Sequence, residues 1–377
     1  MPSGQALRIV HVFRAPTGGL FRHVLDLARA QADAGHDVGL ICDTNGGERA
    51  ASALSAVASR LTLGVARIGM PREPSPFDAT ALARVSRVLL RARPDVVHGH
   101  GAKGGFYGRI APARPWGPGP ARIYTPHGGS AHYGQATPAG RLYGVIERTL
   151  ARRTSVFTFE SDYVAGRFEA MLGDVPHAAV VIHNGLAAHE FEPVLDAPEA
   201  ADILYLGELR RLKGVDTLLE ALSLLRDMLP WEPSAVIVGA GPDEADFRAQ
   251  ARQFGLRGVA FRPPMPARQA FALGRVMAVP SRAESLPYVV IEAAAAQRPL
   301  VATAVGGVPE ILGPFSDRLV PADSPQALAA ALAAVLLKRQ DDRAEEARGL
   351  AAHVAAHFAI DRMAGAVEAA YRKAVRR

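Results

Sequence analysis

Residues 203–241 read ILYLGELRRLKGVDTLLEALSLLRDMLPWEPSAVIVGAG, and this stretch indicates the fold. Two short apolar runs, 203–209 and 235–241, enclose residues 215–229, in which leucines recur at helical spacing. A strand, a crossover helix and a second strand form the unit from which parallel, doubly wound sheets are built. The same pattern continues with a helix over 243–255 and strands over 259–264, 275–281 and 299–307.

The first half of the chain shows the same alternation of strands and helices. A strand over 8–13 is followed by a turn and by a helix in which Leu20, Val24 and Leu27 recur at helical spacing. Further strands are expected over 36–42, 95–100, 121–127, 155–160 and 179–185. Because 377 residues are enough for two domains, we expect an α/β protein with two tandem Rossmann-like, doubly wound domains that face each other across a cleft.

The domain boundaries follow from breaks in this pattern. The first domain is expected over 1–189, an acidic linker with two prolines over 190–200, and the second domain over 201–358. The final segment, 359–377, is expected to be a helix that packs back on the first domain. One face of this helix carries the apolar residues Met363, Val367, Tyr371 and Val375.

Composition excludes several classes of protein. Hydrophobic residues make up 49% and charged residues 21% of the chain, which is typical of a protein with a large core. The single cysteine, Cys42, excludes an internal disulfide and a cysteine-rich metal site. No apolar run is long enough for a transmembrane helix, and Met1 to Leu7 do not resemble a secretory signal. We expect a cytoplasmic protein, either free or held peripherally at the inner face of the membrane.

Positive charge is concentrated in one part of the chain. Residues 79–159 carry a net charge of +10, whereas the whole chain carries +6 and the remainder therefore −4. Such a basic region can face nucleic acid, an anionic membrane or an acidic ligand, or it can be a solvated arginine-rich surface. Nucleic acid is disfavoured, because aromatic residues make up only 6% and are not interleaved with the basic residues.

The segment 280–303 carries the most informative motif. Glu284 and Glu292 lie eight positions apart around a Ser-Leu-Pro sequence, and a proline suits the first turn of a helix. The amide groups at a helix start favour an anion, and carboxylates accept hydrogen bonds from hydroxyls. A nucleotide sugar carries both groups. Alternatively, Glu284 caps the helix and Glu292 is an ordinary surface residue.

The segment 207–216 provides cations between a strand end and a helix start. Arg210, Arg211 and Lys213 lie within reach of the same edge of the sheet, and Lys213 is one of only four lysines. Cations here would neutralise a departing diphosphate. Alternatively, the segment is a basic loop that only caps a helix.

Other motifs argue against cofactors and metals. Gly239-Ala240-Gly241 lacks the third glycine of a dinucleotide fingerprint, so a nicotinamide cofactor is not expected. The chain has no Asp-x-Asp triplet, and no helical histidine pair supports a zinc site. Four histidines fall near strand ends, and we expect His98 and His100 to be satisfied core residues. The four are His11, His98, His100 and His127.

Together these motifs resemble the retaining glycosyltransferases of family 4, which have the GT-B fold and include the glycogen synthase-like enzymes. Glu284-x₇-Glu292 is similar to the E-x₇-E signature of that family, and Lys213-Gly214 to its basic donor loop. The similarity extends over nearly the whole chain, through PTGGLFRHVLDLARAQADAGHDV (16–38), PDVVHGHGAKGG (94–105), YTPHGG (124–129) and VIHNG (181–185).

The resemblance implies residue roles. Glu284 would bind donor-sugar hydroxyls, Lys213 would hold the diphosphate, and His127 would face the sugar, so these three are the predicted catalytic residues. Glu208 stands where the usual donor-loop arginine is found. Arg210 is a candidate to replace that arginine, and the choice among the neighbouring arginines stays open at this point. The predicted donor-binding residues are Gly18, Gly19, Arg210, Gly241, Ser285, Leu286, Pro287 and Glu292.

The implied reaction is retaining, metal-independent transfer of a sugar from a nucleoside-diphosphate sugar to a glycan or a lipid-linked acceptor. No cofactor is expected apart from this co-substrate. The basic region 79–159 lies in the half that should face the acceptor, which suggests contact with an anionic membrane. Two alternatives stay open at this point: a nucleotide-sugar epimerase or phosphorylase of the same architecture, and a non-catalytic two-lobed protein that binds sugars or nucleotides.

Overall fold

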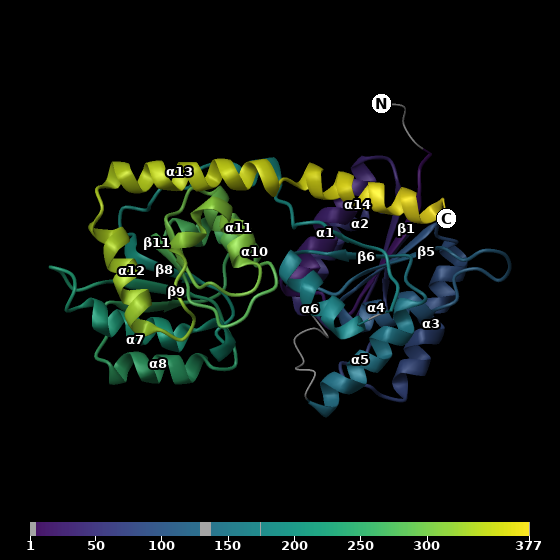
Figure 1. The fold of residues 1–377 in the computed structure, drawn as a ribbon, viewed down its shortest axis with the longest axis horizontal. Helices are drawn as coiled ribbons and strands as arrows, with labels where there is room; N and C mark the ends of the chain where they lie inside the picture. The colour runs from purple at the N-terminus through teal and green to yellow at the C-terminus, as the bar shows by residue number, and fades with distance from the viewer. Residues whose placement is uncertain (1–4, 129–136, 174, 377) are drawn as a thin grey trace. The chain divides into compact units, whose positions relative to one another are not determined.

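The computed structural model describes residues 5–128, 137–173 and 175–376, and the chain divides into two compact units (Figure 1). The first unit comprises Met1–Gly185 together with Ile360–Arg377, and the second comprises Leu186–Ala359. Each unit is built on one parallel sheet with helices on both faces. The predicted class, two Rossmann-like α/β domains in tandem, is confirmed.

The sheet of the first unit has seven parallel strands. It is doubly wound, because the strand order reverses between β1 and β4. Parallel pairing places His11 of β1 opposite His98 of β4, and Phe13 opposite His100. Across the sheet the strands are β3 (Gly64–Arg67), β2 (Asp37–Cys42), β1 (Arg8–Phe13), β4 (Val96–His100), β5 (Ala121–Thr125), β6 (Val156–Phe159) and β7 (Ala179–Val181).

Helices cover both faces of this sheet because successive strand residues point to opposite faces. Ile9 packs in one cluster with residues of α1 and α14, whereas Val10 packs in another with residues of α3 and α4. On α3 the apolar stripe consists of Ala81, Val85 and Leu89, one helical turn apart. The helices are α1 (Gly18–Asp33), α2 (Gly47–Ala58), α3 (Phe77–Ala92), α4 (Gly101–Ile110), α5 (Pro138–Ala151), α6 (Asp162–Leu172) and α14 (Ile360–Val375).

The last helix, α14, lies beside α1 in the first unit (Figure 1). Met363, Val367 and Tyr371 are buried against the sheet, as their spacing predicts. Val375, which we expected on the same buried face, is 43% exposed because it lies at the end of the helix.

The second unit has a five-stranded parallel sheet. Ile203 packs with residues of α7, α8 and α12 on one face, and Leu204 with residues of α10, α11 and α13 on the other. The strand order is β10 (Val259–Arg262), β9 (Ala235–Val238), β8 (Ala201–Leu206), β11 (Gly274–Val279) and β12 (Leu300–Ala302). The α-helices are α7 (Val215–Leu225), α8 (Glu244–Gln253), α9 (Ala267–Phe271), α10 (Tyr288–Ala295), α11 (Val308–Leu312), α12 (Pro325–Leu337) and α13 (Gln340–His357), with 3₁₀ turns η2 (Ala188–Phe191), η3 (Arg211–Lys213) and η4 (Gly313–Arg318).

The structure differs from the expectations at several boundaries. The segment 190–200, expected to be a free linker, is bound to the second unit: the Val194 amide donates to the Ala296 carbonyl at 3.1 Å, and the Ala197 amide to the Ala272 carbonyl at 2.8 Å. The edge strand β3 was not predicted, since only half-buried or exposed residues form it. Strands expected over 121–127, 179–185 and 299–307 are shorter, because their last residues form the loops that follow β5, β7 and β12.

Candidate active site

A charged pair joins two loops that follow strands of the second sheet. Lys213 ends η3, shortly after β8, and Glu284 lies between β11 and α10. The Lys213 Nζ donates to both carboxylate oxygens of Glu284, at 2.7 and 2.9 Å, and the Ser281 hydroxyl donates to one of them at 2.7 Å. The structure therefore brings together two of the three predicted catalytic residues.

Glycines fix the backbone at both members of this pair. Gly214 has a φ of +70°, and a side chain there would place Cβ 1.9 Å from the Pro280 carbonyl oxygen. Gly306 has a φ of +57°, and its Cβ would lie 1.8 Å from the Glu284 carbonyl oxygen. Since L-residues rarely adopt positive φ and neither gap can hold a carbon atom, only glycine fits at these two positions.

The pair is buried on its acidic side and accessible on its basic side. Glu284 is 8% exposed, whereas the Lys213 side chain is 27% exposed. Burial, together with the charges of Glu284 and Glu208, raises the pKa of Tyr205. The Tyr205 hydroxyl therefore stays protonated and donates to the Glu208 carbonyl at 2.8 Å, which ties the loop after β8 to its own strand.

The start of α10 lies next to Glu284 in the chain. Pro287 stands one position before the helix, whereas we expected it inside the first turn. The Pro287 side chain makes no capping hydrogen bond, and the Val290 amide donates to the Pro287 carbonyl at 3.2 Å. Leu286 and Pro287 are buried, while Ser285 and Glu292 are half-buried. The predicted residues around this helix start are thus contiguous with the Lys213–Glu284 pair.

The arginines near Lys213 differ in their partners. The Arg211 guanidinium lies 3.4 Å from Asp246, and its amide donates to Asp243 at 2.7 Å. Arg282 forms an ion pair with Asp216, at 2.7 and 3.0 Å. Arg210 is exposed, and its guanidinium contacts no acidic group among the residues that the structure describes. Arg210 is therefore the arginine of this loop that is available to a ligand.

Gly241 supports the same loop from the neighbouring strand. A side chain at Gly241 would place Cβ 2.2 Å from the Leu209 carbonyl oxygen. The Leu209 amide donates to the Ala240 carbonyl at 3.0 Å, and the Leu209 carbonyl accepts from the Asp243 amide at 3.1 Å. This close approach gives Gly241 a structural reason to be glycine.

In the first unit, Gly18 and Gly19 form the beginning of α1. Both are exposed, and Gly18 has a φ of +70°. The side chain of Thr17 makes no capping hydrogen bond to this 16-residue helix. The first amides of α1 therefore have no acceptor in the helix itself or in the Thr17 side chain. A helix start of this kind favours a negatively charged group.

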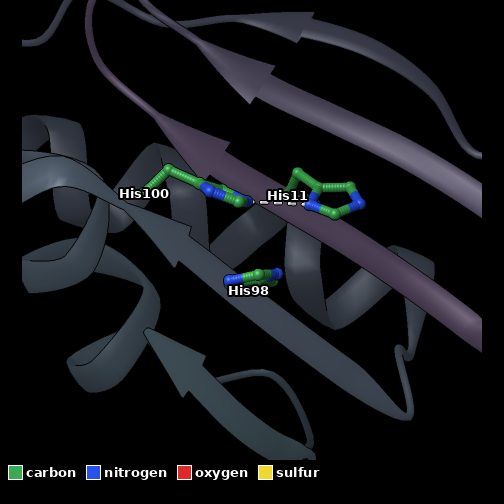
Figure 2. Close-up of side chains that lie close together, drawn as sticks. All are labelled: His11, His98 and His100. Atoms are coloured by element: carbon green, nitrogen blue, oxygen red, sulfur yellow. Dashed lines mark hydrogen bonds between the residues drawn. The ribbon is translucent and has the colours of Figure 1, made fainter. Parts of the chain in front are cut away.

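Five histidines form a buried cluster at the carboxyl end of the first sheet. Three of them, His11, His98 and His100, come from β1 and β4 and are shown in Figure 2. His11 Nδ1 lies 3.0 Å from His100 Nε2, and His100 Nδ1 lies 3.1 Å from His127 Nε2. The fifth ring, His23 of α1, meets His127 edge-on with 4.8 Å between the ring centres. His127, the third predicted catalytic residue, thus belongs to this cluster of five histidines.

Three further ring nitrogens of the cluster are hydrogen-bonded to side chains outside it. His98 Nδ1 lies 2.6 Å from the Tyr371 hydroxyl and His98 Nε2 lies 2.8 Å from the Thr125 hydroxyl. His23 Nδ1 lies 2.9 Å from Asn184 Oδ1. Our interpretation of His98 and His100 as satisfied core residues is confirmed.

Burial keeps these rings neutral. It lowers the pKa of His11 and of His23 from 6.5 to about 4 and lowers the pKa of the other three histidines well below that of an exposed ring. Mutual repulsion of the charged forms acts in the same direction for His11, His98, His100 and His127.

The sequence motifs did not indicate that these histidines meet. The signal available was the strand register, since His11 and His98 pair across β1 and β4, but His23 and Tyr371 come from the helices α1 and α14. Ring nitrogens of His11, His98 and His100 lie within 4.8 Å of one another, as do those of His23, His100 and His127. The expectation that the protein holds no metal stays a prediction.

Two family models match the chain. The model described as Glycosyltransferase Family 4 matches residues 17–189, and the model described as Glycosyl transferases group 1 matches residues 200–338. A D-inositol 3-phosphate glycosyltransferase of Streptomyces avermitilis is 30% identical over 81% of this chain and 72% of that protein. A glycogen synthase of Mycobacterium tuberculosis is 31% identical over 89% of this chain and 86% of that protein. A further D-inositol 3-phosphate glycosyltransferase, from Jonesia denitrificans, is 30% identical over 53% of this chain, and the chain spans only about half (52%) of that relative.

Solved structures share the fold over nearly the whole chain. Sucrose-phosphate synthase from Thermosynechococcus elongatus superposes with a TM-score of 0.77 and 21% identity, over 97% of this chain and 98% of that one. Anabaena HepE in complex with UDP gives a TM-score of 0.77 and 20% identity, over 97% and 99% of the two chains. The predicted architecture of paired Rossmann-like domains is thus found in these proteins.

Proposed function

The chain belongs to the group 1 (family 4) glycosyltransferases, and on that basis we propose that it transfers a sugar from a nucleoside-diphosphate sugar to a glycan or lipid-linked acceptor, with retention of the anomeric configuration. The observation that carries the proposal is the Lys213–Glu284 pair beside the start of α10. A structural neighbour, HepE, is described with UDP and with UDP-glucose, which favours a nucleotide sugar as the donor.

Each group of the second unit has a role in this proposal. Lys213 turns from Glu284 to the diphosphate and, with Arg210, stabilises the negative charge that develops on it as the sugar leaves. Glu284 then accepts hydrogen bonds from sugar hydroxyls, and Glu292 accepts them from the ribose. The start of α10, which follows Glu284 in the chain, lies against the phosphate in this proposal. Because Lys213 and Arg210 supply the positive charge, we propose that the transfer needs no metal.

In the first unit we propose that Gly18 and Gly19 allow the nucleotide sugar to approach the start of α1. His127 contributes from the end of β5, where its ring belongs to the histidine cluster. We propose these three as the residues of the first unit that contact the nucleotide sugar. In the second unit, Gly241 supports the loop before Lys213.

The proposal is tested by thermal shift with a panel of UDP-, GDP- and ADP-sugars, followed by measurement of nucleoside diphosphate release with candidate acceptors. We expect one donor to raise the melting temperature and to release its diphosphate faster when an acceptor is present. A protein that converts a nucleotide sugar without releasing nucleoside diphosphate would fit an epimerase, and this outcome would contradict the proposal. The glycosyltransferase relatives give no support to such an epimerase, a phosphorylase or a non-catalytic protein.

We further propose that the acceptor is reached at an anionic membrane surface, to which the protein binds peripherally from the cytoplasm. None of the helices within the described residues could cross a membrane. On α5, Leu142 and Val145 are 55% and 57% exposed, and Arg141 and Arg148 lie one turn before and one turn after Val145. A helix with apolar and basic residues on one accessible face is typical of membrane-surface segments. Exposed arginines of the basic region include Arg84, Arg87, Arg91, Arg141, Arg148 and Arg152; residues 129–136 of that region lie outside the described residues.

Co-sedimentation with phosphatidylcholine vesicles, with and without phosphatidylglycerol, tests this second proposal. We expect binding only to the anionic vesicles, and weaker binding by the double variant Leu142→Ser/Val145→Ser. The matched control is Leu195→Ser, since Leu195 is an 83% exposed apolar residue of the second unit. Equal binding to both vesicle types would refute it.

A further inference from the structure

A chain of hydrogen bonds runs from His127 into the core of the first unit. It passes from His127 Nε2 to His100 Nδ1 at 3.1 Å, and from His100 Nε2 to His11 Nδ1 at 3.0 Å. Figure 2 shows the second of these contacts, between rings on neighbouring strands. The chain ends at the side chain of Gln31 on α1, whose Oε1 lies 2.8 Å from His11 Nε2.

Gln31, the last residue of this chain, determines which atom donates and which accepts in every hydrogen bond of the chain. The Gln31 oxygen can only accept, so His11 must carry its proton on Nε2, and the Nδ1 of a neutral His11 must accept. His100 therefore donates from Nε2 and accepts at Nδ1. It follows that His127 donates from Nε2 and has an unprotonated Nδ1. Neutral rings are required for this deduction: His11 and His100 are fully buried, and desolvation lowers the pKa of the half-buried His127 well below its ordinary value.

The Gln31 amide also joins a second branch, with its oxygen facing His11 and its nitrogen facing Tyr371. Its Nε2 lies 3.4 Å from the Tyr371 hydroxyl, which lies 2.6 Å from His98 Nδ1. With the amide in this orientation, Tyr371 receives a proton from Gln31 and gives its own to His98. His98 then donates from Nε2 to the Thr125 hydroxyl, at 2.8 Å. A reversed amide would reverse both branches together, so one side chain sets the tautomers of the whole set.

The backbone at the outer end shows that the position of His127 is imposed by its surroundings. His127 has a φ of +51°, a left-handed conformation that residues other than glycine rarely adopt. Such strain persists only where neighbouring contacts determine the conformation, and it is common at functional sites. No partner for His127 Nδ1 is found among the described residues, whereas Nε2 is held by His100. Nδ1 is thus the nitrogen left for a ligand.

We propose that Gln31, acting through the two histidines between them, fixes His127 as the tautomer with an unprotonated Nδ1. That nitrogen accepts a hydrogen bond from a hydroxyl of the donor, which the opposite tautomer could not do because it would present an N–H instead. Gln31, His11 and His100 are positioning residues, since they act only through His127. The identity of the ligand, a nucleotide sugar, rests on the proposed function. The tautomer of His127 follows from the hydrogen bonds alone.

The tautomer is measured directly by long-range ¹H–¹⁵N correlation spectra of protein labelled at its twelve histidines. We expect wild-type His127 to be protonated at Nε2 and not at Nδ1. Gln31→Met keeps the length of the side chain and removes both polar groups, so His127 should populate both tautomers. His11→Leu interrupts the same chain of hydrogen bonds one residue closer to His127, so His127 should again populate both tautomers. The matched control is Asn184→Leu, which removes a buried amide bonded to His23 and should leave the tautomer of His127 unchanged.

Kinetics with the donor identified by the thermal-shift panel supply the functional readout. Loss of one hydrogen bond between neutral groups predicts a fall of about three- to tenfold in kcat/KM for Gln31→Met. A wild-type His127 protonated at Nδ1 overturns the proposal even if every variant fails to fold. Mixed tautomers in Gln31→Met with unchanged kcat/KM overturn the positioning role. If no nucleotide sugar is turned over while the spectra are as predicted, the proposed function fails and the tautomer assignment is supported.

Discussion

Acidification should destabilise the first unit well above the pH at which most carboxylates titrate. The pKa of His11 and that of His23 are lowered from 6.5 to about 4 in the folded protein. A group with a depressed folded-state pKa contributes stability that is present above pH 6.5 and is lost as the pH falls through 6.5 toward 4, because the unfolded chain binds the proton first. The sign is therefore a loss of stability on acidification.

The magnitude follows from the two pKa values. For each of these histidines, linkage gives a loss of about 2 kcal/mol in the free energy of unfolding between about pH 7.5 and about pH 5. His11 and His23 together give about 4 kcal/mol, and the three other cluster histidines act in the same direction. Domains are stable by only about 5–15 kcal/mol, so this is a large part of the total.

The assay is urea unfolding at a series of pH values, followed by pulsed hydrogen exchange and mass spectrometry. Peptides from β1 and β8 report on the two units separately, which matters because the units need not unfold together. In His11→Gln the unfolded state takes up about one proton fewer, so the slope of stability against pH should fall by up to about 1.4 kcal/mol per pH unit. The exposed His357 provides the matched control, since His357→Gln should leave the slope for β1 unchanged. A loss below about 1 kcal/mol between the two pH values would refute the assignment of a buried neutral cluster.

Three further predictions concern single positions. Gly214→Ala should destabilise the second unit by about 1–3 kcal/mol and slow turnover by displacing Lys213, because the added Cβ meets a carbonyl oxygen. The control is Gly255→Ala, since Gly255 has a φ of +65° but no atom closer than 3.9 Å to the added Cβ. In the same urea titration this control should show only the smaller cost of the backbone conformation. Glu147→Leu should destabilise the first unit by about 3–5 kcal/mol, because it removes the charge partner of the buried Arg109 guanidinium, which lies 2.7 Å from Glu147. The double variant Glu147→Leu/Arg109→Met should recover most of that loss. Equal melting temperatures for Glu147→Leu and wild type would contradict this prediction. Burial raises the pKa of the Cys42 thiol to about 11, so a thiol reagent at about pH 8 should label Cys42 only after denaturation, and rapid labelling of the native protein would show that this strand is accessible.

Local sequence patterns were sufficient to predict most of the fold. The apolar run 8–13 forms β1, and the apolar run 235–238 forms β9, which ends where Gly239 begins. The spacing of Val215, Leu218, Leu219 and Leu222 produces one buried face of α7. The edge strand β3 escaped prediction because its residues are half-buried or exposed and carry no clear alternation. The packing of segment 190–200 against the second unit depends on backbone hydrogen bonds, which residue types do not reveal.

The candidate site was predictable where its residues share a short segment, and not where they meet only through tertiary structure. Glu284 and Lys213 were both singled out, but their 2.7 Å contact follows from the packing of two loops 71 residues apart. Which arginine is free was undecided from the sequence, and the acidic partners of Arg211 make Arg210 the available one. The histidine cluster requires the register of β1 and β4 together with two helices, so its residues could be named individually but not as a set.

Turnover by Lys213→Ala tests most directly the claim that Lys213 stabilises a departing nucleoside diphosphate. The measurement is release of the diphosphate from the donor found in the thermal-shift panel, with Lys338→Ala, an exposed lysine of the same unit, as the control. We predict a fall in kcat of about 100-fold or more for Lys213→Ala and normal turnover for Lys338→Ala. The melting temperature of Lys213→Ala should fall only modestly, because Ser281 still donates to Glu284. Near-normal turnover by Lys213→Ala would contradict the account.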